Sequence, residues 1–162
     1  MKRAYGILGL LVVAILGLSI VSHLAGQGDD KTKIQQALRD SLEASRKGEA
    51  GKVLDSLSSK LSFNGEEASG MGRQIAGFIR NQKPDITVTN QVPIITGDEA
   101  RITSPVRMQV SVPIMGDKSV TVKDVVMVFH KETAREYLVI PVTKWRLTEV
   151  QAPPGFESVI VE

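Results

Sequence analysis

Asp124 is the side chain in this sequence with the clearest potential for acid–base chemistry. It interrupts a series of valines at every second position, Val120, Val122, Val126 and Val128. His130 follows at the end of this series. A three-residue turn at 116–118 would pair Val112 with Val122 and Val110 with Asp124, and register is fixed by the face that must be buried. On that register Asp124 and His130 point inward. A carboxylate in an apolar pocket has a raised pKa and can carry a proton.

A second interpretation places Asp124 in a structural role. Val125, Met127 and Phe129 are apolar as well, so a β-bulge near Asp124 would exchange the buried and exposed faces of the strand. Asp124 would then be a bulge residue that accepts backbone hydrogen bonds. The sequence leaves both interpretations open.

His130 and Tyr137 complete the set of candidate ligand-binding residues with Asp124. A single histidine does not make a metal site, and six residues of strand separate His130 from Asp124 by roughly 20 Å, which is too far for a catalytic dyad. The sequence has no cysteine, which excludes disulfides, thiol catalysis and thiolate zinc sites. We expect neither a metal ion nor another cofactor.

The charge distribution argues against nucleic acid as a partner. Lys2 and Arg3 account for the formal net charge of +2, and the chain beyond them carries eighteen basic and eighteen acidic residues. No basic stripe interleaved with aromatic residues is present.

Ala4–Leu24 is an uncharged, mostly apolar run of twenty-one residues directly behind Lys2 and Arg3. As a helix it is long enough to cross a bilayer core of roughly 30 Å, and the preceding basic residues favour a cytoplasmic N-terminus. We therefore expect a single-pass anchor at 1–25 that places the remainder outside the cytoplasm, on the periplasmic side of a bacterial inner membrane. The alternative is a signal peptide cleaved after Ala25, although His23 occupies a position where a small residue is preferred.

Three helices are expected behind a linker at 26–30, in which Asp29 or Asp30 can cap the first of them. Helical spacing of apolar residues predicts helices over 31–47, 49–61 and 73–81, with Gly48 ending the first and Pro84 following the third.

The period then changes from about 3.6 to 2, which predicts four long antiparallel strands. The expected strands are 85–95, 100–114, 120–132 and 137–151, with turns at 116–118 and 133–135. Pro105 and Pro113 lack a donor, so the second strand is expected to be an edge strand or to bend at these residues. The resulting class is α+β, with three N-terminal helices on a curved four-stranded sheet.

The order of elements resembles the nuclear transport factor 2-like superfamily. The residues that carry the resemblance are Gly97–Ile102, Asp124–Phe129 and Lys144–Leu147. The resemblance implies a cone-shaped domain over 31–151, with a tail at 152–162, in which the sheet wraps around the helices and Trp145 closes the core.

These features predict a membrane-tethered, extracytoplasmic domain that binds a partner protein or a small ligand and has no catalytic role, such as a component of an envelope assembly. A homodimer through the sheet face is expected, with Val125, Met127 and Phe129 as its apolar patch. The alternative is a small exported isomerase, cyclase or dehydratase with Asp124 as general base, which requires Asp124 to be buried beside a cavity.

Overall fold

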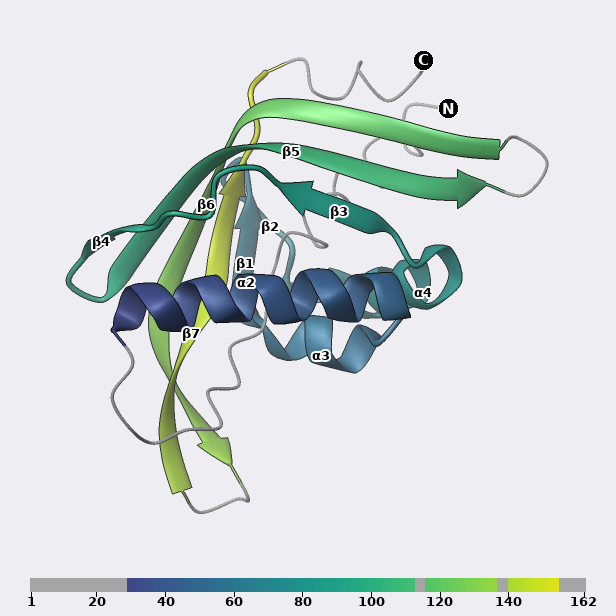
Figure 1. Ribbon diagram of the computed structural model, residues 1–162. Coiled ribbons are helices and arrows are strands. Elements are labelled where there is room, and N and C mark those ends of the chain that lie inside the picture. The colour runs from purple at the N-terminus through teal and green to yellow at the C-terminus, as the bar shows by residue number, and fades with distance from the viewer. Residues whose placement is uncertain (1–28, 113–115, 137–139, 155–162) are drawn as a thin grey trace.

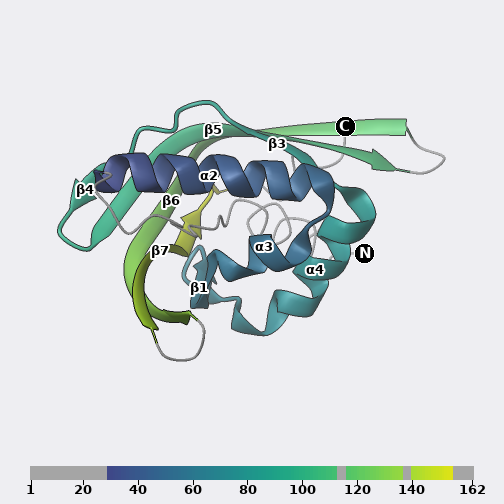
Figure 2. The ribbon, with the colours of Figure 1, turned by 60° about the horizontal axis from the view of Figure 1, so that its bottom comes forward.

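The computed structural model describes residues 29–112, 116–136 and 140–154. Three helices, α2 (Asp30–Lys47), α3 (Ala50–Asp55) and α4 (Gly72–Gln82), lie on one side of a curved sheet, and Figure 2 shows the sheet bending around them. The strands are β1 (Leu57–Phe63), β2 (Glu66–Glu67), β3 (Asp85–Val88), β4 (Ile94–Thr96), β5 (Glu99–Val112), β6 (Gly116–Glu136) and β7 (Ile140–Gln151). A short 3₁₀ turn, Ser69–Met71, precedes α4.

The sheet has seven strands in the order β2-β1-β7-β6-β5-β3, and β4 pairs with β5 (Figure 1). The expected α+β class is confirmed, but the sheet is larger than the four strands predicted. The β1–β7 pair is parallel, so the sheet is not purely antiparallel. Within the described residues no helix is long and apolar enough to span a membrane. The predicted anchor Ala4–Leu24 lies outside the described residues.

The first and third helices were predicted to within about one residue. In α2, Ile34, Ala37, Leu38 and Leu42 form the buried stripe. Gly48 ends this helix in the left-handed conformation at φ 75°, where its N–H donates to the Ser45 carbonyl. Asp29 occupies the N-cap position, but its side chain makes no capping hydrogen bond.

The predicted helix 49–61 is wrong in its second half, which forms strand β1. Leu57 and Leu61 are four residues apart, a spacing that places them on one face of a strand as well as of a helix. The serines between and beside them have weak helix propensity. The Ser56 carbonyl accepts a hydrogen bond from the Leu147 N–H, so pairing with β7 decides the structure of this segment.

The predicted strand 85–95 is interrupted and forms β3 and β4. Two hydrogen bonds to β5 hold the segment between them. The backbone N–H of Asn90 donates to Ser104 Oγ, and the side-chain amide of Asn90 donates to the Thr103 carbonyl. The strand predicted at 120–132 extends over 116–136, so the turns predicted at 116–118 and 133–135 are wrong, because both segments pair within the sheet as parts of β6. Residues 137–139 lie outside the described residues.

A β-bulge in β6 moves the buried face of the strand from even to odd positions. Ser104 pairs with Val125 and Val106 pairs with Val122, so Lys123 and Asp124 together oppose Pro105. Pro105 has no N–H to donate to the ladder, which is why the irregularity falls here. Val122 is buried before the bulge, and Val125, Met127 and Phe129 are buried after it.

The core lies between the concave face of the sheet and the helices. Its fully buried side chains include Ile34, Leu38, Ile75, Ile79, Ile102, Met127, Phe129 and Leu147. Trp145 is 2 % exposed and packs in this core, as the resemblance implied. These side chains form one packed cluster between the sheet and the helices.

Candidate functional site

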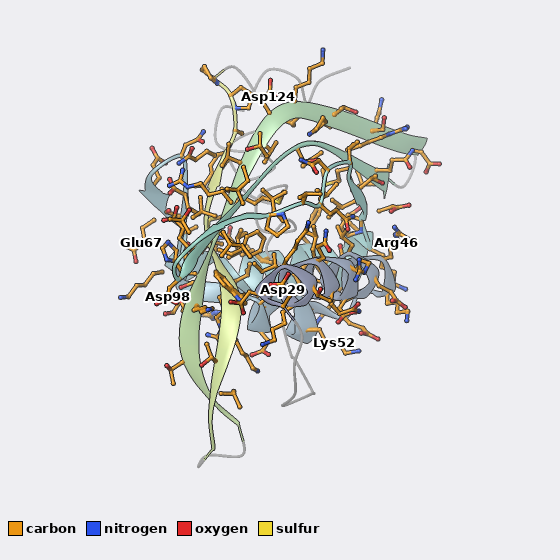
Figure 3. All side chains as sticks on the ribbon, turned by 60° about the vertical axis from the view of Figure 1, so that its left-hand side comes forward. Asp29, Arg46, Lys52, Glu67, Asp98 and Asp124 are labelled. Atoms are coloured by element: carbon orange, nitrogen blue, oxygen red, sulfur yellow. The ribbon has the colours of Figure 1, made fainter. Side chains whose placement is uncertain are left out.

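Asp124 lies on the exposed side of the sheet. It is the bulge residue, with a left-handed φ of 56°, and is exposed. Figure 3 places it at the bend of β6 at the top of the view, above Asp29 and Lys52 on the helical side. The register that would have turned it inward is wrong, because Val112 pairs with Gly116 and Val110 with Lys118. Asp124 therefore does not meet the requirement for a general base inside the cone.

The apolar patch proposed for dimerisation is likewise not at the surface. Val125, Met127 and Phe129 are each at most 1 % exposed and belong to the core, because the bulge turns them toward the helices. A dimer on the sheet must therefore use the opposite, outer face.

His130 lies on this outer face beside an ion pair. It is the Cα partner of Glu99 on β5 and of Arg146 on β7. Its Nε2 is 3.4 Å from Glu99 Oε2, and Glu99 Oε1 accepts a 2.6 Å hydrogen bond from Arg101. The Arg101 guanidinium lowers the pKa of the Glu99 carboxyl, and Glu99 in turn raises the pKa of Arg101. The sequence did not indicate the pairing of His130 with Glu99, since Glu99 is thirty-one residues away.

Tyr137, the third candidate, lies outside the described residues. Within the residues that the structure describes, no three His, Cys, Asp or Glu side chains are grouped so that they could hold a metal ion.

The start of α2 contains a polar cluster that the sequence did not predict. Lys131 Nζ lies 2.8 Å from Asp30 Oδ2 and 5.1 Å from the centre of the Trp145 ring, a cation–π distance. The Trp145 indole donates to Asp30 Oδ1 at 3.3 Å. Lys131 and Trp145 are Cα partners in β6 and β7, so both face Asp30 across the edge of the cone.

This cluster has clear electrostatic consequences. The hydrogen bond from Lys131 lowers the pKa of the Asp30 carboxyl, and the indole N–H of Trp145 adds to the effect against the opposing cost of desolvation. The same carboxylate raises the pKa of Lys131. An open cavity of about 500 Å³ adjoins the cluster, and Lys33, Asp98, Thr133 and Thr143 are among the residues that line it.

A second cluster joins α3 to the hairpin of β6 and β7. Ser58 Oγ donates to Glu132 at 2.5 Å, and the Arg146 guanidinium lies 3.7 Å from Glu132 and 3.8 Å from Asp55. Lys144 is only 7 % exposed and pairs with Asp55 at 3.5 Å. The paired charges are opposite in sign, so the cluster holds the strands together and gives the buried lysine the partner that it needs.

A wider hollow of about 570 Å³ lies between α2 and α3 and is lined by Asp40, Glu43, Glu49 and Asp55, together with Lys47 and Lys52. Its lysines pair with neighbouring carboxylates, Lys47 with Glu43 and Lys52 with Glu49, each at 2.5 Å. These are pairs within one helical turn at the surface, and such pairs are ordinary for a solvated helix face.

Comparison with known proteins identifies the fold. No protein-family model matches the chain, and no curated protein matches it in sequence. Among solved structures, a nuclear transport factor 2-like superfamily protein from Salmonella enterica superposes with a TM-score of 0.56 at 18 % identity, over 76 % of this chain and 89 % of that one. The described domain has the nuclear transport factor 2-like fold.

Two further structures share this fold. A putative calcium/calmodulin dependent protein kinase II association domain from Xanthomonas campestris superposes with a TM-score of 0.51 at 15 % identity, over 83 % of this chain and 94 % of that one. A CaMKII hub from S. rosetta superposes with a TM-score of 0.52 at 15 % identity, over 80 % of this chain and 98 % of that one. At these identities the similarity is one of fold alone.

Proposed function

We propose that this chain is a membrane-tethered, extracytoplasmic binding domain without a catalytic role, and that the outer face of its sheet contacts a partner protein. The observation that carries the proposal is the distribution of polar groups. Among the described residues, apolar side chains pack in the interior of the cone, the Asp30–Lys131 pair lies at its edge, and charged residues of both signs gather on the outer face. An acid–base enzyme of this fold would need the reverse arrangement, with a polar group beside a cavity inside the cone.

The outer face has the properties of a polar recognition surface. Alternation along β5, β6 and β7 places Glu99, Arg101, His130 and Arg146 on it. The exposed Thr103 lies on the same face, where Val126 and Val128 are the Cα partners of Thr103 and Arg101. Mixed charges of this kind contribute to orientation and specificity more than to affinity. A second copy related by a two-fold axis could place the basic side chains of one sheet opposite the acidic side chains of the other.

Fold similarity supports an assembly role of this kind. Two of the similar structures are, by their own descriptions, an association domain and a hub. We propose the corresponding role here, either between two copies of this chain or with another component of a bacterial envelope assembly.

The tether is proposed from the sequence. Lys2 and Arg3 followed by Ala4–Leu24 favour a single span with its N-terminus in the cytoplasm and the domain in the periplasm. Alkaline extraction of membranes tests the span, because an integral protein stays in the pellet. An intact N-terminus by mass spectrometry excludes cleavage after Ala25, whereas a mature start at Gly26 would show a secreted protein.

A small ligand is the second candidate occupant, and the cavity beside Asp30, Lys131 and Trp145 is the observation that favours it. Its volume of about 500 Å³ falls within the range of small-molecule pockets, and it presents a cation, carboxylates and an aromatic edge.

The mass of the detergent-solubilised chain tests the dimer form of the proposal. We expect light scattering to give twice the protein mass of one chain. We expect Arg101→Glu to reduce this mass, because a glutamate at 101 would face the acidic side chains of the second copy. Arg80→Glu on α4 is the matched control, since Arg80 is also an exposed arginine but lies on the helical side. A single-chain mass for the unaltered protein would exclude a homodimer. An equal decrease of mass in both variants would exclude the outer face as the dimer interface.

A further inference from the structure

We infer that the end of the domain where α2 begins rests on the bilayer surface, and that Val92 and Ile94 enter the lipid interface there. The inference depends on the proposed tether and adds the face and the residues through which the domain meets lipid.

Val92 and Ile94 are exceptional in their exposure. They are the large hydrophobic residues that remain exposed in the described part of the chain, at 50 % and 75 %. Pro93 between them is buried, so the two side chains point to the same side. An exposed apolar pair in an otherwise well-buried domain indicates a contact surface.

Hydrogen bonds hold the segment that carries the pair. The Val92 N–H donates to Asn90 Oδ1 at 3.1 Å, and Asn90 is itself held by two hydrogen bonds to β5. A fixed segment presents its side chains without an additional ordering cost on binding.

This segment lies beside the first turns of α2. The Gln35 side-chain amide donates to the Gln91 carbonyl at 3.0 Å, and Gln35 is five residues into the helix, about 7.5 Å along its axis. On the other side of β4, the Asp98 carbonyl accepts from the Lys131 N–H, and the Lys131 ammonium binds Asp30. Figures 1 and 2 both place β4 at the end of the molecule where α2 starts.

Chain length brings that same end to the membrane. Five residues, 25–29, separate the end of the apolar run from α2, and fully extended they span at most roughly 17 Å. A tether of this reach keeps the start of α2, and with it β4, near the headgroup region. The β5–β6 hairpin projects at the far end of the domain (Figure 1).

The charges at this end decide the type of contact. Asp29, Asp30 and Asp98 are matched in number by Lys31, Lys33 and Lys131. Arg101, the Cα partner of Ile94, is paired with Glu99 at 2.6 Å, so these charges also balance. Attraction to anionic headgroups is therefore small, and the contact depends on apolar insertion. The occupant of this surface is the bilayer interface rather than a specific anionic lipid.

Spin labelling of the full-length chain in vesicles of phosphatidylcholine and phosphatidylglycerol tests the inference. The absence of native cysteine makes single-site labelling clean. Labels are placed at Ile94→Cys, at Leu16→Cys within the proposed span, and at Arg80→Cys on exposed α4 as the aqueous control. The measured quantity is the ratio of collisions with oxygen, which concentrates in lipid, to collisions with a water-soluble nickel chelate.

We expect the ratio at Ile94 to exceed that at Arg80 by roughly three-fold and to lie below that at Leu16, as for a side chain at interfacial depth. Replacing all phosphatidylglycerol by phosphatidylcholine should leave the Ile94 ratio nearly unchanged. Val92→Asp should lower it toward the Arg80 value, whereas the matched surface change Asn81→Asp should not.

Equal ratios at Ile94 and Arg80, with Leu16 in lipid, would overturn the inference and leave the tether intact. A water-accessible Leu16 would refute the tether itself. A label at Ile94 shielded from both reagents would show a protein occupant and would also overturn the inference.

Discussion

Substitution of Asp124 distinguishes a bulge residue from a buried base because the two roles predict opposite orders of stability. At φ 56° an L-residue costs about 1–2 kcal/mol, and aspartate reduces this cost through local hydrogen bonding. Asp124→Ala loses that local bonding and should destabilise the domain by about 0.5–1 kcal/mol. Asp124→Val adds β-branching in a left-handed position and should cost about 2 kcal/mol.

Asp124→Gly should differ little from the unaltered protein. Glycine removes the strain at the bulge. It also raises the conformational entropy of the unfolded chain, which lowers stability by roughly 0.5–1 kcal/mol and offsets that gain. Asp124→Asn should be at least as stable as aspartate, because asparagine tolerates this conformation well. The expected order is therefore Asn and Gly near Asp, then Ala, then Val.

Urea unfolding of the detergent-solubilised chain measures this order. Trp145 is the only tryptophan and is 2 % exposed, so its fluorescence reports loss of the core. The urea concentration at the unfolding midpoint is compared among the variants, provided that their m-values are equal. A carboxylate buried in the cone would be costly to ionise, so valine would then be the most stabilising replacement. A Val variant more stable than the Gly variant would refute the bulge assignment.

Three further predictions concern the core, the first helix and the cluster at its start. Phe129→Ala should destabilise the domain by about 3–5 kcal/mol in the same urea assay, and a loss below 1 kcal/mol would contradict its placement in the core. Gly48→Ala should cost about 1 kcal/mol of stability because the φ of Gly48 is 75°. Gly77→Ala, whose added methyl lies in open space on α4, should stabilise the domain by roughly 0.5–1 kcal/mol. Equal shifts of the thermal midpoint in the two variants would refute this difference. Lys131→Met should cost about 1 kcal/mol at neutral pH.

The Lys131 variant also has a pH signature. The pKa of Asp30 is held below its ordinary 3.8 by Lys131, so this contribution is complete above pH 3.8 and is lost as the pH falls through the lower folded value. The variant should therefore lose less stability than the unaltered protein on acidification from pH 5 to 2.5. The pKa of Lys131 is raised, so its contribution holds below its ordinary 10.5 and is lost only in more alkaline solution. Parallel acid profiles for the two proteins would contradict the pairing.

The sequence predicted those elements whose pattern had one physical interpretation. In α2 the apolar stripe, its length and Gly48 all agree, and β5 alternates over its whole length with one wet face. The α+β class and the resemblance to nuclear transport factor 2-like domains follow from these elements. The segment 57–61 failed because a spacing of four is compatible with both periods, and only its distant partner β7 decides between them.

The candidate site was less predictable because it depends on contacts between distant residues. The position of Asp124 follows from one bulge, and a bulge changes the face of every residue after it. Pro105 was a usable signal, since its missing donor marks where the ladder breaks. The cluster of Asp30, Lys131 and Trp145 joins residues up to 115 apart, and no local pattern connects them.

Photo-crosslinking in native membranes tests directly whether the outer sheet face binds a protein partner. A benzoylphenylalanine is placed at Thr103, which is exposed on that face, and at Gln74, which is exposed on α4. We expect a discrete crosslinked adduct at Thr103 and none at Gln74. Its mass should be twice that of the chain for a second copy, or a fixed larger mass for another envelope protein. Adducts of equal yield at both positions, or none at Thr103, would contradict it.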